Sequence, residues 1–152
     1  MTETATDLKL IALDGEDLAV ISAHVQDALV KRGEIAYLAA QKRFALGAWR
    51  YDWAADAAGR KERVGAALRF DRVMKVSQIG LSGLKPEATL NLLAVSFDES
   101  DPPAGFVTLT FSGGAAIRLE VECLEGELRD LGPRQQVETC PGHALADEPQ
   151  TS

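Results

Sequence analysis

Three aromatic rings at a spacing of two residues are the strongest indication of a binding surface in this sequence. The rings belong to Trp49, Tyr51 and Trp53, and a continuous strand would place all three on one face. Tryptophan and tyrosine dominate the energetic hot spots of binding surfaces. Two interpretations stay open: the rings face a ligand or partner, or a helix covers them and they belong to the core, as large aromatics mostly do.

Arginine side chains near these rings favour an anionic or peptide ligand. A guanidinium group binds planar anions with two parallel hydrogen bonds and also stacks on aromatic rings. We therefore predict a binding site for a protein or a small anionic ligand, formed by Trp49, Arg50, Tyr51, Trp53, Arg43 and Arg69.

Carboxylates on a later strand offer a second kind of chemistry. Glu120 and Glu122 alternate with Val121 and follow Arg118, so all three side chains would share one outward face. Two carboxylates can act as general acid and base, but that chemistry needs an enclosing pocket, of which the sequence gives no sign. A small enzyme with carboxylate and arginine chemistry is therefore the alternative to a binding module.

Histidine, cysteine and metal chemistry have few candidate residues. A catalytic relay needs a histidine held rigidly beside its nucleophile, yet His24 falls on a helix flank and His143 in a polar tail. Cys140 and His143 would supply only two of the four ligands of a zinc site. No phosphate-binding glycine loop and no CxxC pair occurs. We expect no catalytic residue, no metal and no cofactor.

The N-terminal elements follow from local signals. Residues 9–13 form an apolar run typical of a strand, and Asp14 is suited to cap the next helix, because its carboxylate can accept free backbone N–H groups. An apolar stripe then recurs at helical spacing: Leu18, Ile21, Val25, Ala28 and Leu29. The pattern predicts an amphipathic helix that ends near 31–33.

Beyond this helix the apolar period changes to two, which indicates strands. The alternation predicts about seven strands, including 43–53, 64–70, 88–97 and a hairpin that turns at Ser112-Gly113-Gly114. Leu124, Leu128 and Leu131 then return to helical spacing, before Gly132-Pro133. We expect a short C-terminal helix that packs on the sheet and stops at this Gly-Pro pair.

These elements predict an α+β fold. Its sheet is mostly antiparallel, with about seven strands in a barrel or sandwich, an N-terminal amphipathic helix and a short C-terminal helix. The element order looks like that of a pleckstrin-homology barrel. Residues 1–132 are expected to form one domain, and 133–152 a polar, mobile tail.

Composition limits the function further. The chain has 152 residues, 46% hydrophobic residues and a net charge of −7, which argues against nucleic-acid binding. Residues 31–75 hold eleven of the sixteen basic residues, either compensated by acids on neighbouring strands or forming a cationic face. The polar start of the chain and the lack of a long apolar stretch favour a cytoplasmic protein without a membrane span.

Four segments also resemble a known family. They are LKLIALDGEDLAVISAHVQDAL at 8–29, RFALGAWRYDW at 43–53, LNLLAVSF at 90–97 and VTLTFSGGAAIRLEVECLEGELRDLGP at 107–133. Together they resemble a family of small alphaproteobacterial proteins catalogued as domain of unknown function 2948. The resemblance implies a bacterial, cytoplasmic protein and carries no activity, ligand or site residues.

The function that these observations favour is a non-catalytic cytoplasmic binding or adaptor module that uses the aromatic and arginine face. The alternatives are the small enzyme described above and a homodimeric structural protein whose strand edges pair between subunits.

Overall fold

The computed structural model describes residues 7–141. Its helices are α1 (Gly15–His24) and α2 (Trp53–Ala57), with 3-10 turns at Arg32–Glu34, Ala39–Gln41 and Ser112–Gly114. Its strands are β1 (Lys9–Ala12), β2 (Ala28–Lys31), β3 (Ile35–Leu38), β4 (Arg43–Tyr51), β5 (Glu62–Phe70), β6 (Val73–Ile79), β7 (Thr89–Glu99), β8 (Gly105–Phe111), β9 (Ala116–Val121) and β10 (Gly126–Gln136).

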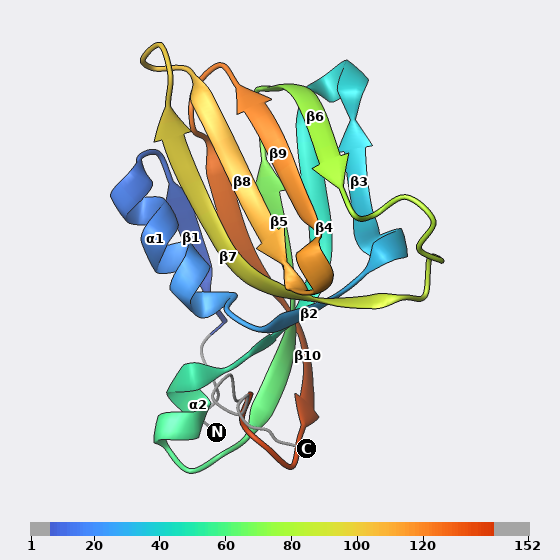
Figure 1. The fold of residues 1–152 in the computed structure, drawn as a ribbon. Coiled ribbons are helices and arrows are strands. Elements are labelled where there is room, and N and C mark those ends of the chain that lie inside the picture. The colour runs from blue at the N-terminus through green and yellow to red at the C-terminus, as the bar shows by residue number, and fades with distance from the viewer. Residues whose placement is uncertain (1–6, 142–152) are drawn as a thin grey trace.

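All ten strands belong to one antiparallel sheet. Its order is β1-β10-β5-β4-β2-β7-β8-β9-β6, and β3 pairs with β4 outside this path. The sheet bends at the short strand β2, so that the half formed by β7, β8, β9 and β6 lies in front of the half formed by β10, β5 and β4 in Figure 1. The expected antiparallel α+β class is confirmed, and the expected number of about seven strands is wrong.

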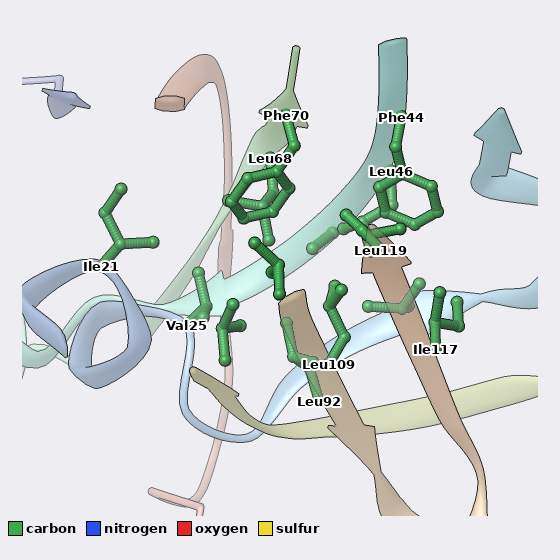
Figure 2. Packing of buried hydrophobic residues seen from close by; sticks show 14 of the residues in the cluster. Ile21, Val25, Phe44, Leu46, Leu68, Phe70, Leu92, Leu109, Ile117 and Leu119 are labelled. Atoms are coloured by element: carbon green, nitrogen blue, oxygen red, sulfur yellow. The ribbon is translucent and has the colours of Figure 1, made fainter. Parts of the chain in front are cut away.

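The core lies between the two halves of the sheet. Phe44 and Leu46 of β4 and Phe70 of β5 point toward Leu109 and Leu119 of the opposite half, as Figure 2 shows. Each of these side chains is at most 2% exposed. The strict alternation of large apolar residues along these strands is what lets each half bury one face.

Helix α1 covers the edge that β7 leaves open beyond β2. Asp14 caps the helix by accepting the N–H of Asp17 at 2.8 Å, as predicted. β2 pairs with β7 only as far as Leu92. Further along β7, Ser22 of α1 accepts the N–H of Val95 at 2.9 Å, so the helix satisfies a strand group that has no strand partner on that side.

The predicted helix is too long at its C-terminal end. It ends at His24, and Asp27 adopts a left-handed conformation with a φ of 63°. Residues 28–31 then form β2, which joins the two halves by pairing with both β4 and β7. The apolar spacing of Ala28 and Leu29 fits either a helix or a strand, and the free strand edges on both sides favour the strand.

The predicted C-terminal helix is also wrong, because β10 occupies this segment. β10 pairs with β1 on one edge and with β5 on the other, so its backbone groups are satisfied without a helix. A closing C-terminal helix, which the pleckstrin-homology layout requires, is therefore not formed within residues 7–141. Residues 133–136 of the expected tail belong to β10, and the tail from residue 142 lies outside the described residues.

Candidate functional site

A wide irregularity in β10 shapes the outer face of the sheet, which is the face turned away from the core. Asp130 pairs with Ala66 and Arg134 with Val64, so three residues of β10 stand opposite Gly65 alone. Gly132 at the middle of this bulge has a φ of +113°, a conformation that favours glycine. Pro133 of the bulge lies over Gly65, where a Cβ would meet its ring at 3.7 Å, and Gly65 itself adds no side chain to the space beside the bulge.

The space beside the bulge is a groove of about 380 Å³. Trp49 lies across the strand pair from Gly65, and Leu29 lies across from Trp49 on its other side. We call this hollow the Trp49 groove; its lining also includes Lys31, Glu34, Gly47, Thr89, Leu131 and Pro133. A hollow of this size with an apolar, aromatic lining and a few polar groups is typical of small-molecule sites.

The three aromatic rings do not share one face. Trp49 is half-buried in the groove, whereas Tyr51 is fully buried and Trp53 begins α2. Tyr51 and Trp53 meet edge to face, with ring centroids 4.7 Å apart. The prediction of a common strand face is wrong because β4 ends at Tyr51. Asp52 caps α2 by accepting the N–H of Ala55 at 3.0 Å, so a local cap ends the alternation.

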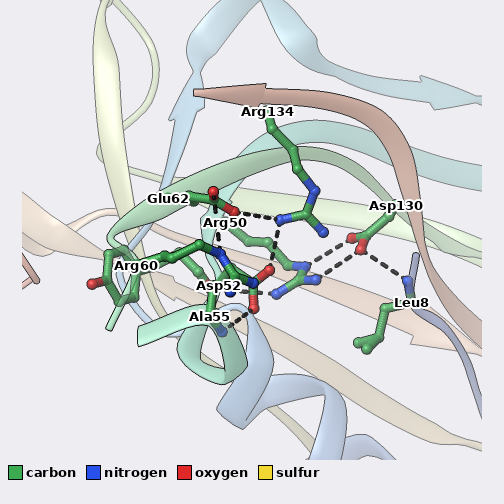
Figure 3. Close-up of polar contacts among 9 residues, drawn as sticks. Leu8, Arg50, Asp52, Ala55, Arg60, Glu62, Asp130 and Arg134 are labelled. Atoms are coloured by element: carbon green, nitrogen blue, oxygen red, sulfur yellow. Dashed lines mark hydrogen bonds and ion pairs between the residues drawn. The ribbon is translucent and has the colours of Figure 1, made fainter. Parts of the chain in front are cut away.

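Arg50 is a core residue. It is 2% exposed, and it donates from Nε to Asp130 Oδ1 at 2.8 Å and from Nη2 to Oδ2 at 2.7 Å. Asp130, whose side chain is fully buried, also accepts the N–H of Leu8 at 2.9 Å. Figure 3 shows this pair inside a cluster of charged residues. The bidentate pair holds the guanidinium group away from any outer-face ligand.

The same cluster contains a second arginine with two carboxylates. Arg134 Nη1 donates to Asp52 Oδ2 at 2.7 Å and to Glu62 Oε1 at 3.1 Å. Burial opposes the ionisation of Asp52, but the hydrogen bonds from Arg134 and Ala55 outweigh it and lower the pKa of that carboxyl. These contacts join the lower ends of β5 and β10 to α2 and give the cluster a structural role.

The two remaining predicted arginines are paired on the outer face. Arg43 Nε lies 2.8 Å from Asp71, and Arg69 lies 3.3 Å from Asp71 and 2.8 Å from Glu127. Of the eleven basic residues in 31–75, six form ion pairs with acids, so the compensation that one of our two interpretations predicts holds for part of this segment. The structure brings Arg43 and Arg69 together and places neither in the lining of the Trp49 groove.

Two titratable groups near the cluster shift away from their ordinary values. Burial and then the positive charge of Arg50 lower the pKa of His24, against the opposing effect of Asp130. Burial and the hydrogen bond to Asp56 raise the pKa of Tyr51, whose hydroxyl donates to that carboxylate at 2.6 Å. Both shifts keep the neutral forms at neutral pH.

The residues of the enzyme alternative lie apart from the groove. Arg118, Glu120 and Glu122 are exposed on the other half of the sheet, and Arg118 stacks on Phe106 at 3.9 Å. Within residues 7–141, no group of His, Cys, Asp and Glu is arranged to hold a metal ion. Cys140 is exposed there, while its expected neighbour His143 lies outside the described residues.

Most of the groove could not be predicted from the sequence. Of the predicted site residues only Trp49 lines it. One available signal was a glycine inside each of two strand patterns, Gly47 and Gly65, since such glycines mark a close approach or an opening. The bulge at 131–133 had no local signal apart from Gly132-Pro133, which fits a helix stop equally well.

The fold and the groove together define a small antiparallel α+β protein with a candidate binding site on the outer face of its bent sheet. No helix of the described chain is both long and apolar enough to span a bilayer.

Residues 8–143 match the model of the family described as protein of unknown function (DUF2948), so the chain belongs to this family. Neither the curated proteins nor the solved structures contain a significant match to the chain.

Proposed function

We propose that this protein is a non-catalytic binding module and that the Trp49 groove is its binding site. The single observation that carries the proposal is the bulge of β10 opposite Gly65, which opens a hollow of about 380 Å³ beside a half-buried tryptophan. The apolar lining supports binding through contact with Trp49, Leu131 and Pro133.

In this proposal a lysine, and not the predicted arginines, binds the anionic group of the ligand. Arg50, Arg43 and Arg69 are each held by a carboxylate, which neutralises them toward a ligand. Lys31 lines the groove and is exposed, and it supplies the positive charge for an anionic group there. The anionic ligand that the sequence predicts therefore has a cationic partner on this face.

The proposal places the protein in the bacterial cytoplasm. Cys123 and Cys140 are both free thiols, which fits a reducing compartment.

The test uses 1-anilinonaphthalene-8-sulfonate, an aromatic anion whose fluorescence rises in an apolar site. Its ring matches the wall formed by Trp49, and its sulfonate matches Lys31. We expect saturable binding of one dye per chain, with energy transfer from tryptophan. Gly65→Leu should weaken this binding at least about tenfold, because the leucine side chain fills the apolar part of the groove. A tenfold weaker affinity corresponds to a loss of ~1.4 kcal/mol in binding free energy.

Gly65→Leu is suited to this test because the backbone accepts a side chain at this position. A Cβ on Gly65 would meet the Pro133 ring at 3.7 Å, an ordinary contact, so the rest of the leucine has to occupy the groove. Thr110→Leu is the control, because it introduces leucine at an exposed strand position on the other half of the sheet, away from the groove. Unchanged dye binding by Gly65→Leu, with a native near-ultraviolet circular dichroism spectrum, would refute the proposal.

A further inference from the structure

Two opposite charges line the Trp49 groove without pairing with each other. Lys31 and Glu34 are both exposed lining residues. Among residues 7–141, neither takes part in any ion pair. By contrast, Arg43, Asp71 and Arg69 are linked to one another by ion pairs.

Both charged side chains lie beside other lining residues of the groove. Glu34 Oε1 lies 3.1 Å from the position that a Cβ on Gly47 would occupy, so the missing side chain lets this carboxylate lie over β4 at the groove. Lys31 of β2 is the cross-strand partner of Thr89 of β7, and Thr89 also lines the groove. An ammonium group and a hydroxyl on adjacent strands are suitable donors for one carboxylate.

The size of the groove limits what can satisfy both charges. Its volume of about 380 Å³ is near the lower end of the range of about 300–1,000 Å³ for ligand pockets. The space therefore suits one small molecule better than an extended peptide. Such a molecule needs an apolar body for Trp49, an anionic group for Lys31 and a cationic group for Glu34.

We propose that the Trp49 groove binds a small zwitterion of the α-amino-acid class. Its side chain packs on Trp49 between Leu29 and Pro133, its carboxylate binds Lys31 and Thr89, and its ammonium group binds Glu34. This assignment rests on the proposed binding function of the groove and adds the chemical class of the ligand.

The experiment compares three probes with the same benzyl side chain by NMR chemical-shift titration of the full chain. L-phenylalanine carries both charges, L-phenylalaninamide lacks the carboxylate, and N-acetyl-L-phenylalanine lacks the ammonium group. We expect L-phenylalanine to shift amides around Gly65 and Trp49. Each lost charge should weaken binding about two- to fivefold, the range that partly exposed ion pairs provide.

Variants assign each preference to one side chain. Lys31→Met should remove the preference for L-phenylalanine over its amide, and Glu34→Gln the preference over the N-acetyl compound. Lys75→Met and Glu120→Gln are the matched controls, since both residues are exposed on the other half of the sheet. Both preferences should persist in these controls.

The outcomes separate the two proposals. If the three probes bind equally well at the groove, or if the preferences survive Lys31→Met and Glu34→Gln, the zwitterion assignment is wrong while the binding function stands. If L-phenylalanine causes no shifts but the fluorescent dye still binds in a manner sensitive to Gly65→Leu, the amino-acid class is again excluded. Loss of both signals refutes both proposals.

Discussion

Replacing Arg50 with methionine should destabilise the whole fold because it leaves a buried carboxylate without its cation. Asp130 is fully buried and would keep only the N–H of Leu8 as a donor. Two charge-assisted hydrogen bonds disappear, each worth about 1.5–3 kcal/mol, and breaking a buried ion pair costs about 3–5 kcal/mol. We therefore expect Arg50→Met to lower the free energy of unfolding by about 4 kcal/mol.

Urea unfolding followed by tryptophan fluorescence and circular dichroism measures this loss. With a denaturant slope of about 2 kcal/mol per molar urea, the midpoint should fall by about 2 M. Arg129→Met is the matched control, since Arg129 is 53% exposed and lies 3.3 Å from Glu127. Glu127 is buried but keeps Arg69 at 2.8 Å when Arg129 is replaced, so no carboxylate loses its last cation and the control should shift the midpoint little.

The double variant Arg50→Met/Asp130→Asn tests the reasoning itself. The amide oxygen still accepts the N–H of Leu8, but no buried charge remains, so at least half of the loss in Arg50→Met should be recovered. The two substitutions should therefore couple by well over ~0.5 kcal/mol. Additive losses, or a midpoint for Arg50→Met equal to that of Arg129→Met, would refute the view that this pair is a buried, mutually dependent unit.

Three further predictions concern stability and pH. Asp14→Ala removes the cap that accepts the N–H of Asp17 and should lower the free energy of unfolding by about 0.5–2 kcal/mol, measured by thermal melts beside the exposed control Glu16→Ala. Phe70→Ala should cost about 3–5 kcal/mol in urea unfolding, because this ring is fully buried in the core; a loss below 1 kcal/mol would contradict the packing. His24 has its pKa lowered from 6.5 by burial, so the unfolded chain binds its proton more tightly, and stability should fall as pH drops below about 6.5. His24→Asn should flatten this part of the stability profile, and an unchanged slope between pH 7.5 and 5 would count against the shift.

Much of the sheet could be predicted because its signals are local. Phe44, Leu46 and Ala48 alternate along β4 with less buried residues, and all three are buried in the core. Asp14 caps α1 through a contact three residues away. Such features depend only on neighbouring residues and on the period of the chain, so they are visible without the partner strands.

The candidate site could be predicted only in part, because its geometry depends on strands far apart in the sequence. Of the residues that the sequence predicts for the binding site, Trp49 lines the groove, whereas Arg50 is buried in the core. Its actual partner, Asp130, is 80 residues away. Arg50 lies two residues after the inward-facing Ala48 and therefore also points inward. An arginine can be buried in the core, however, only where a carboxylate pairs with it.

The sequence by itself determined the α+β class, the apolar faces of the central strands, the first helix cap and the family resemblance. Only the tertiary structure decided that residues 28–31 and 126–136 are strands. Their apolar spacing also fits a helix, but they pair with the open edges of β4 and β7 and of β1 and β5. The tertiary structure also decided the groove, because the bulge of β10 faces Gly65 and Trp49 only in the register of three paired strands. The reason is that hydrogen bonds between strands are non-local, so their register outweighs a weak local preference.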